Sequence, residues 1–422
     1  MGGQRQRIPG SVIHPPAVDA ARWPAVAHRP GPSRSRDALA RSLVRRALDR
    51  LPLRVRYGTG PVRGTTGPLL EIADPETFVR RVRRDGLVGF GESYLAHEWD
   101  AVDLVGVLTV FAAHADRIVP RWAQRLRGAW APRRPAGQHH TPEAAPKHVH
   151  HHYDLSNELF GLFLDPTLSY SAALFSHLPA TWDDLAAAQA RKIDRLLDLA
   201  GVGPGTRLLD IGTGWGALAL RAALRGARVV TVTLSEEQRR LAARRALRDG
   251  LTDRITLLLR DYRELEGRYD AIVSVEMIEA IGAAYWPRYF GTLQELLAPG
   301  GRIALQAITM PHDRMLATRH TYTWMQKYIF PGGFLPSVTA LEQCAARHTR
   351  LRVARRDAYG DHYAQTLRLW RERFTARDAE VAALGFDTTF RRMWTFYLAY
   401  SEAGFRARYL DVQQILLQEA DR

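Results

Sequence analysis

The second half of the chain alternates between short apolar runs and helical patterns, and this alternation restricts its possible folds more than any other feature. Strand-like runs occupy residues 206–212, 228–234, 254–262, 270–277 and 302–310, and helical patterns occupy residues 186–202, 217–226, 236–250 and 286–301. Apolar strands separated by helices of about 10–15 residues are typical of a parallel sheet covered on both faces. The pattern predicts an α/β fold with a doubly wound, mostly parallel, Rossmann-like sheet.

The chain of 422 residues is too long for one ordinary hydrophobic core, so we expect two domains. Residues 1–35, rich in Pro, Gly, Arg and Ser, predict a disordered basic N-terminus. Residues 36–130 predict a smaller, mainly helical domain with short strand-like runs at 52–58 and 68–73. Residues 131–147, with four prolines, predict a linker, and residues 148–422 then form the catalytic domain.

Two helix boundaries in the first domain follow from single residues. The helical pattern of residues 73–86 ends at Gly86, which is a common helix terminator. The helical pattern of residues 101–119 follows Asp100, which we expect to be its N-cap.

The charge is positive and uneven. The chain has a net charge of +15, and residues 1–147 hold 24 basic and 13 acidic side chains, a net of +11. Such a surface attracts phosphate, either in nucleic acid or in anionic lipid headgroups, although it can also be merely a solvated basic surface. No apolar run reaches the length of a membrane span or the core of a signal peptide, and Cys344 has no disulfide partner, so we expect a cytoplasmic protein.

A histidine tract, His148 and His150–His152, raises the question of a metal site. No carboxylate or thiolate at ligand spacing accompanies it, so we expect no metal.

The run LLDIGTGWG, residues 208–216, leads from a predicted strand into a predicted helix and indicates a cofactor site. Asp210 precedes three glycines, Gly212, Gly214 and Gly216, which allow a tight turn and a close approach of the backbone to a ligand. The second strand ends without the acidic residue that a nicotinamide ribose requires, whereas the third ends in Asp261 and Tyr262, which suit an adenine amine and ring. This favours an S-adenosylmethionine-dependent methyltransferase over a dehydrogenase.

Two carboxylates, Glu276 and Glu279, follow the strand-like run in SVEMIEAIG, residues 274–282. From the residues alone they could bind a metal, transfer a proton, contact the cofactor or cap a helix.

The chain resembles the cyclopropane fatty acid synthases, including the mycolic acid cyclopropane synthases. The matching runs are HYDLSNELF (152–160), DPTLSYSAALF (165–175), LLDIGTGWG, VTLSEEQ (232–238), RDYREL (260–265), SVEMIEAIG, KYIFPGGFLPS (327–337), YGDHYAQTLRLW (359–370) and FYLAYSEAGFRAR (396–408). Residues 86–100 are also similar to the N-terminal domain of full-length bacterial members.

The resemblance implies methyl transfer from S-adenosylmethionine to the double bond of an unsaturated phospholipid acyl chain. It places Tyr170, Ser171, Gly212 and Gly214 at the methionine end of the cofactor, Thr233, Leu234 and Gln238 at the ribose, and Asp261 and Tyr262 at the adenine. Methyl transfer to an alkene leaves a carbocation, which aromatic faces can stabilise. The candidates are Phe160, Tyr170, Trp324, Tyr328, Phe330 and Tyr363.

In the family, a bound bicarbonate is understood to accept the proton. The resemblance maps its ligands onto Glu279, Tyr363 and the amide of Ile308, and it gives Glu276 a place near the cofactor or a structural role. This chain departs from the family where a cysteine and a histidine are expected, with Ala172 and Gln306, and has Ala280 after the glutamate. Because Gln306 cannot carry a positive charge, we expect a longer-lived cation and a 10-methylene product, as in the tuberculostearic acid pathway, in preference to a cyclopropane ring.

The resemblance also implies a homodimer that associates peripherally with the inner face of the membrane, with the basic first domain contacting anionic headgroups. The alternatives left open are a small-molecule methyltransferase, a nucleic-acid methyltransferase and a lipid-binding protein without activity. The N-terminal domain argues against the first, and the lack of a recognisable RNA-binding module argues against the second, so we expect no nucleic-acid partner.

Overall fold

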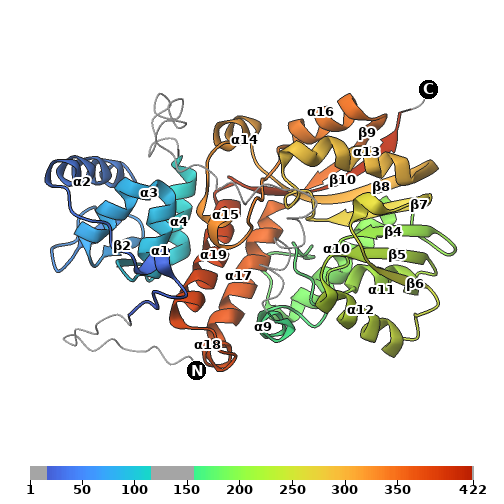
Figure 1. Cartoon of the computed structure of the whole chain (residues 1–422), viewed down its shortest axis with the longest axis horizontal. Helices are drawn as coiled ribbons and strands as arrows, with labels where there is room; N and C mark the ends of the chain where they lie inside the picture. Colours follow the sequence, from blue (N-terminus) through green and yellow to red (C-terminus); the bar gives the residue numbers. More distant parts are fainter. Residues whose placement is uncertain (1–16, 116–155, 421–422) are drawn as a thin grey trace.

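The computed structural model describes residues 17–115 and 156–420, and its larger part is built on a seven-stranded sheet (Figure 1). The strands are β4 (Arg207–Ile211), β5 (Arg228–Thr233), β6 (Ile255–Leu259), β7 (Tyr269–Val275), β8 (Leu297–Thr309), β9 (Leu351–Ala358) and β10 (Asp411–Glu419). Their order is β6-β5-β4-β7-β8-β10-β9. The first five are parallel, and β10 runs antiparallel to both β8 and β9. The predicted α/β fold with a mostly parallel sheet is therefore confirmed.

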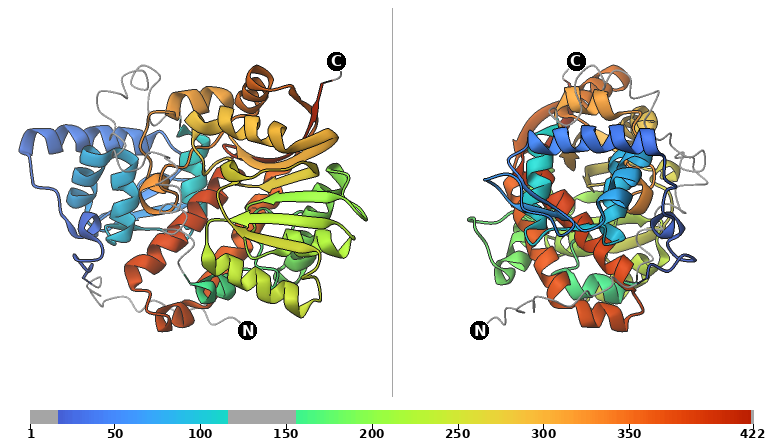
Figure 2. Two further views of the ribbon diagram at one scale, coloured as in Figure 1. Left: turned by 45° about the vertical axis from the view of Figure 1, so that its right-hand side comes forward. Right: turned by 90° about the vertical axis from the view of Figure 1, so that its left-hand side faces the viewer.

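Helices cover both faces of this sheet because its strands are apolar on both faces. Along β8, Ile303 and Leu305 belong to a core shared with α13 (Trp286–Leu296) and α16 (Val338–His348), while Ala304 packs with α10 (Leu185–Leu199) and α11 (Ala217–Leu224). The helix α12 (Glu236–Arg248) joins the second face, and Figure 2 shows the two helical layers on either side of the strands. The sheet is thereby buried as a parallel sheet requires.

The remaining helices of this part are α9 (Asn157–Phe163), α14 (His312–Thr318), α15 (Trp324–Tyr328), α17 (Gly360–Ala376), α18 (Asp378–Ala383) and α19 (Thr388–Arg406), with short 3₁₀ turns at Trp182–Asp184, Tyr262–Glu264 and Ala283–Tyr285. The long helices α17 and α19 pack against each other, and α19 also contacts the N-terminal part of the chain through α4 (Leu104–Ala113) (Figure 1).

The N-terminal part is a small α/β unit. Its three-stranded sheet has the order β1 (Arg54–Tyr57), β2 (Leu69–Ile72) and β3 (Trp99–Asp100), and its helices are α1 (Pro24–Ala27), α2 (Arg34–Asp49), α3 (Pro75–Leu95) and α4. The two short strand-like runs are thus strands. Helix α3 continues beyond the predicted end at Gly86, where the backbone kinks with φ 56° and ψ −127°.

Two expectations for this part are wrong. Asp100 lies in β3, and the N-cap of α4 is Asp103, whose side chain accepts a hydrogen bond from the backbone N–H of Gly106. The disorder expected for residues 1–35 does not hold for residues 17–35, because Val26 in α1 is buried and the indole of Trp23 donates to Asp387 at 2.8 Å. The predicted linker, residues 131–147, and the histidine tract lie outside the described residues, and the predicted domain boundaries stay a prediction.

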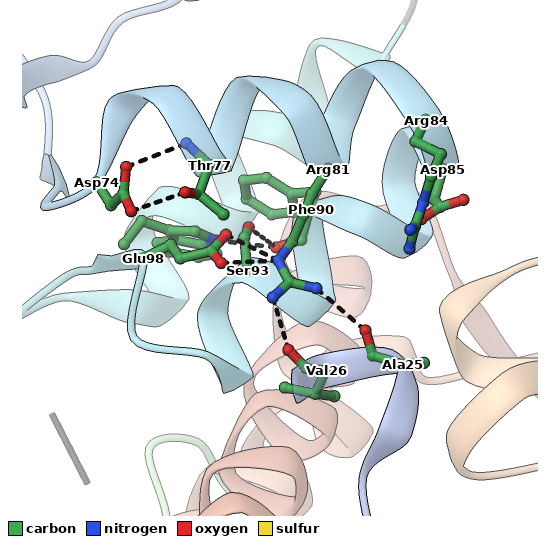
Figure 3. A network of polar contacts seen from close by, with 11 residues as sticks. Ala25, Val26, Asp74, Thr77, Arg81, Arg84, Asp85, Phe90, Ser93 and Glu98 are labelled. Carbon is green, nitrogen blue, oxygen red and sulfur yellow. Dashed lines mark hydrogen bonds and ion pairs between the residues drawn. The ribbon is translucent and has the colours of Figure 1, made fainter. Parts of the chain in front are cut away.

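Buried polar contacts join α1 to the rest of the N-terminal part (Figure 3). Arg81 on α3 is 1% exposed, and its Nε donates to both carboxylate oxygens of Glu98 at 2.8 and 2.9 Å. Its two other nitrogens donate to the carbonyl oxygens of Ala25 and Val26 at 3.1 and 2.6 Å. One guanidinium therefore connects α1, α3 and the turn before β3.

Across residues 17–115 and 156–420, the structure contains no helix that is both long enough and apolar enough to span a membrane.

Candidate active site

The glycine-rich turn after β4 adopts the conformation that its sequence requires. Gly212, Gly214 and Gly216 have φ values of 102°, 50° and 91°, which side-chain-bearing residues rarely adopt. A Cβ atom at Gly216 would approach Ala242 Cβ to 3.0 Å, so this glycine allows α11 and α12 to pack closely. A Cβ atom at Gly214 would meet nothing within 4 Å, so the backbone there has open space beside it. The turn therefore fits a ligand that lies directly on the main chain.

Asp210 lies at the end of β4 with its carboxylate fully buried. It accepts a hydrogen bond from Thr231 at 2.8 Å, and Thr231 and Thr213 share another at 2.7 Å. Burial raises the pKa of Asp210 to about 7, against the lowering effects of Thr231 and Lys192. Thr231 on β5 thus connects Asp210 on β4 with Thr213 in the glycine turn.

The residues expected at the ribose lie at the end of β5. Thr233 donates to the side-chain oxygen of Gln238 at 2.8 Å, and the backbone N–H of Gln238 donates to Ser235 at 3.3 Å, which caps α12. Thr233 and Gln238 are buried, and Leu234 between the strand and the helix is half-buried. The structure thus brings the side chains of Thr233 and Gln238 into contact. Leu234 is their neighbour in sequence.

The residues expected at the adenine are already engaged with neighbours. The carboxylate of Asp261 accepts from the backbone and the guanidinium of Arg263, with an Nη2–Oδ2 distance of 2.6 Å. The ring of Tyr262 is buried edge-on against Tyr289, with centroids 5.6 Å apart. Arg263 therefore fixes the position of the Asp261 carboxylate that would contact the adenine.

Tyr170 and Ser171, expected at the methionine end of the cofactor, lie in the segment between α9 and α10. Tyr170 shares a hydrogen bond with Tyr397 at 2.7 Å and packs against Trp370 at a centroid distance of 5.2 Å. The Ser171 hydroxyl accepts from the ammonium group of Lys192 at 2.6 Å.

Glu276 is the centre of the most extensive polar network in the site. Its Oε1 accepts from the backbone N–H of Ala172 at 2.9 Å and from the amide of Gln306 at 2.7 Å. Its Oε2 accepts from the hydroxyl of Tyr363 at 2.6 Å. Burial raises the pKa of Glu276, while these three donors and the charge of Lys192 act to lower it.

The backbone of Glu276 is strained. Its φ is 50°, in the left-handed region that only a few non-glycine residues adopt, and this costs about 1–3 kcal/mol. The turn directs the side chain toward Ala172 and Tyr363 immediately after β7 ends. Residues in such conformations cluster at functional sites, where the surrounding contacts hold them in place.

Gln306 connects Glu276 to the adjacent strand. Its amide nitrogen also donates to the Ala172 carbonyl at 3.3 Å, and its oxygen accepts from the Tyr359 hydroxyl at 2.7 Å and from Gln414 on β10 at 3.2 Å. These bonds fix the orientation of the Gln306 amide, so that it presents its NH₂ group to Glu276.

Glu279 lies three residues further along, in the turn after β7 and in a different environment. Its Oε1 accepts from the backbone N–H of Ile308, whereas its buried Oε2 finds no hydrogen-bond partner among the described residues. Burial, and secondly the charge of Glu276, raise the pKa of Glu279 to about 8. Burial and the neighbouring charge therefore favour the neutral form of Glu279.

These contacts divide the predicted proton-transfer group. The amide of Ile308 donates to Glu279, whereas the side chains of Tyr363 and Gln306 donate to Glu276. The Ala172 amide, the Gln306 amide and the Tyr363 hydroxyl are all satisfied by the Glu276 carboxylate. The residues present consequently do not fit a bicarbonate in contact with Gln306 and Tyr363.

The structure differs from the sequence prediction of the site at two residues. Sequence reasoning left Glu276 with a minor role, and it did not find Lys192, which is 2% exposed on α10. Burial lowers the pKa of Lys192 to about 8, and the nearby Glu276 acts to raise it. A signal was available, because this arginine-rich chain has only three lysines, Lys147, Lys192 and Lys327. Lys192 donates to buried Ser171, and the half-buried Lys327 donates to buried Glu92.

The candidate aromatic side chains pack against one another or against other rings. Tyr363 packs against Phe405 at 4.6 Å and against Trp370 at 6.3 Å between ring centroids. Phe160 packs against Tyr170 at 5.2 Å, and Phe330 against Tyr397 at 5.9 Å. Trp324 and Tyr328, the other two candidates, lie together 5.4 Å apart on α15, beside the N-terminal part.

Within residues 17–115 and 156–420, no cluster of three or more His, Cys, Asp or Glu side chains is arranged to hold a metal ion.

The strand order, with its antiparallel β10 beside β8, and the glycine turn after the central strand β4 are the architecture of S-adenosylmethionine-dependent methyltransferases. Within this class, the chain belongs to the mycolic acid cyclopropane synthetase family, whose model matches residues 140–415. It is accordingly an S-adenosylmethionine-dependent fatty-acyl methyltransferase.

Three relatives illustrate the similarity. The tuberculostearic acid methyltransferase of Mycobacterium tuberculosis is 53% identical over 407 residues, covering 94% of this chain and 95% of the relative. The cyclopropane-fatty-acyl-phospholipid synthase of Escherichia coli is 33% identical over 358 residues, covering 84% and 89%. The crystal structure of mycolic acid cyclopropane synthase CmaA1 complexed with SAH and CTAB has a TM-score of 0.59 and 32% identity, covering 68% of this chain and 99% of that one.

Proposed function

We propose that this enzyme methylates the cis double bond of an oleoyl-type phospholipid acyl chain and forms a 10-methylene product. The similarity to the tuberculostearic acid methyltransferase, which extends over 94% of the chain, carries this proposal. A cyclopropane ring is the second candidate, because a cyclopropane-fatty-acyl-phospholipid synthase is also similar over most of the chain.

We assign one group of residues in the candidate site to cofactor binding and another group to the lipid double bond. When bound, S-adenosylmethionine supplies an electrophilic methyl group. The residues proposed to hold it are Tyr170, Ser171, Asp210, Gly212, Gly214, Gly216, Thr233, Leu234, Gln238, Asp261 and Tyr262. The open space beside Gly214 supports this assignment.

The other side of the site would receive the lipid double bond. We assign Glu279, Tyr363, Gln306 and the amide of Ile308 to the region where the product forms. Aromatic rings there exclude water, and their faces stabilise a cation. Tyr363 lies between Phe405 and Trp370 and is buried, and its hydroxyl donates to Glu276, so it connects the aromatic wall to that carboxylate.

The neutral side chain of Gln306 favours the methylene product. A charged imidazole at this position would repel a neighbouring carbocation, whereas the amide of Gln306 does not. A cation that survives longer has time for a hydride shift from the methylated carbon. Loss of a proton from the new methyl group then leaves an exocyclic double bond.

The product can be tested directly. We expect expression in a bacterial host that contains oleoyl phospholipid but no cyclopropane synthase to yield fatty acid methyl esters enlarged by one CH₂ group. The two candidate products have the same mass, so proton NMR is needed to distinguish vinylic methylene protons from upfield cyclopropane protons. Cyclopropane signals would refute the methylene assignment, and no enlarged ester would refute both.

The surface of α2 supports docking to anionic membranes. Leu39 and Leu43 are 64% and 56% exposed, and they lie on one helical stripe with Arg36, Arg46 and Arg50, which are also exposed. Exposed leucines flanked by arginines suit an interface where headgroup phosphates meet acyl chains. We assign this stripe, residues 36, 39, 43, 46 and 50, to peripheral contact with the inner face of the membrane.

A chain of contacts leads from this N-terminal part toward the site. Buried Glu92 on α3 accepts from Lys327 and, at 2.7 Å, from the Tyr328 hydroxyl on α15. A few residues later, the backbone N–H of Phe334 donates to the Glu279 carbonyl at 2.8 Å. Residues 327–334 therefore contact both α3 of the N-terminal part and the backbone of Glu279, which suits an enzyme that draws its substrate from a membrane.

Replacing both Leu39 and Leu43 by glutamate is expected to abolish binding to vesicles of anionic phospholipid. The change removes apolar insertion and places negative charge against the headgroups, where each basic residue contributes about 1 kcal/mol. Flotation with vesicles at low and high salt measures the effect. Leu247→Glu on α12, at a leucine that is 70% exposed, is the matched control and should float like the wild type. Equal flotation of all three proteins would contradict the assignment.

The homodimer implied by the family resemblance stays a prediction, which light scattering of the purified protein can test. A soluble small-molecule substrate is the remaining alternative, and it would leave the N-terminal part without a role.

A further inference from the structure

The carboxylate of Glu276 occupies a complete anion-binding site inside the protein. Three donors from three separate segments converge on it: the Ala172 amide before α10, Gln306 on β8 and Tyr363 on α17. Lys192 lies close enough to stabilise its negative charge. A bicarbonate or similar anion bound from solution would need these same three donors. The Glu276 carboxylate already occupies them, so it takes the place of such an anion.

The backbone supports the same interpretation. Glu276 keeps a left-handed conformation at φ 50°, which glycine would adopt without strain. A side chain at such a position is retained only when its contacts hold it there. The backbone N–H of Glu276 donates to the Gln306 carbonyl at 2.7 Å, and its carboxylate accepts the three other hydrogen bonds, so these contacts hold the strained residue and place its charged group.

We propose that Glu276 is the proton acceptor of the reaction and that the enzyme works without bicarbonate. This inference rests on the proposed function. In the proton-loss step, a C–H bond of the lipid cation breaks and its electron pair forms the new carbon–carbon bond. That bond is the second bond of an exocyclic methylene, or the closing bond of a ring. The proton passes to a carboxylate oxygen of Glu276, which becomes a carboxylic acid and returns the proton to solvent before the next turnover.

The surroundings of Glu276 suit this role. Tyr363 donates to Oε2 and is packed by Phe405 and Trp370, so the acceptor oxygen lies next to the aromatic wall assigned to the cation. Burial raises the pKa of Glu276, which makes the carboxylate a stronger base than one in water, while its three donors and Lys192 act to lower the pKa. Among the described residues, the carboxylate of Glu279 has one donor, the Ile308 amide, and an unpartnered Oε2, and burial together with the charge of Glu276 raises its pKa to about 8, so the neutral form is favoured more at Glu279.

The test compares full-length wild-type enzyme, Glu276→Gln and Glu276→Gly on oleoyl phospholipid vesicles with S-adenosylmethionine. Each is assayed in buffer freed of carbon dioxide and in the same buffer with added bicarbonate. We expect wild-type turnover to be equal in both buffers and Glu276→Gln to lose at least about a hundredfold in both. Glu276→Gly exposes the three donors at a position where glycine is unstrained, and we expect added bicarbonate or formate to restore part of its activity.

Binding of S-adenosylhomocysteine by calorimetry, expected to be unchanged, shows whether each variant is folded, and Glu266→Gln, at an exposed glutamate, is the matched control. Stimulation of the wild type by bicarbonate would overturn the proposal. So would a folded Glu276→Gln variant that keeps more than about a tenth of the activity. If the wild type methylates no lipid in either buffer, the proposed function itself fails, and this inference fails with it.

Discussion

Replacing Arg81 by methionine is expected to destabilise the folded protein by about 3–5 kcal/mol. The change leaves the Glu98 carboxylate, which is 3% exposed, without its partner, and it also removes the donors to the Ala25 and Val26 carbonyls (Figure 3). A buried charge without a partner is far more costly than the loss of the pair as a whole. Urea unfolding followed by tryptophan fluorescence measures the effect, because Trp99 lies in the adjoining core.

Two further variants test this reasoning. Arg84→Met changes an exposed arginine on the same helix and should alter the free energy of unfolding by less than about 0.5 kcal/mol. The double variant Arg81→Met, Glu98→Leu removes both charges and should recover much of the loss. If the double variant is as unstable as Arg81→Met alone, the cost comes from lost packing or from the α1 carbonyls, and the explanation by an unpaired charge is wrong.

The cost of Arg81→Met should also depend on pH. Burial already raises the pKa of Glu98 to about 7, although Arg81 acts to lower it. Without Arg81 the carboxyl group holds its proton to higher pH still, so at pH 6 it is neutral and its burial is less costly. The destabilisation should therefore be smaller at pH 6 than at pH 8.

The sequence predicts those strands and helices whose pattern of apolar residues matches their burial in the folded protein. The five parallel strands are apolar because both faces of the sheet are buried, so their pattern identifies them. Strand β9 is different: it lies at the edge of the sheet, and its sequence LRVARRDA is mostly exposed and charged. Charged side chains are common on edge strands, where they discourage aggregation. Because of them, β9 lacks the apolar pattern by which the other strands are predicted.

In the candidate site, too, the sequence identifies residues without showing which contacts they make. Spacing places Glu276 and Glu279 after a strand, but it does not show where each side chain points. The left-handed backbone at Glu276 turns this side chain toward Tyr363 and Gln306, which lie 87 and 30 residues away in sequence. Likewise, Arg81 is one of four arginines in RRVRR, and only the tertiary structure distinguishes the buried one.

Replacing Glu279 by glutamine is expected to remove a large part of the pH dependence of stability. The pKa of Glu279 in the folded protein is about 8, raised from 4.5. Between these values the folded protein holds a proton that the unfolded chain releases. The contribution of this group to stability is therefore fully present below pH 4.5 and is lost as the pH rises toward 8. At about 1.4 kcal/mol per pKa unit, the difference amounts to a few kcal/mol.

Glutamine stays neutral at every pH, and its side-chain oxygen can still accept from the Ile308 amide, so the variant avoids burying a charge. Its unfolding free energy should be close to that of the wild type at pH 5 and higher by a few kcal/mol at pH 8, as measured by urea unfolding across this range. Glu295→Gln, at an exposed glutamate, makes the same change in net charge and should follow the wild type at both pH values. Parallel curves for wild type and Glu279→Gln would mean that Glu279 is ionised in the folded protein. The pair would then hold two negative charges, a state that the unpaired Oε2 of Glu279 and its repulsion by Glu276 make unfavourable.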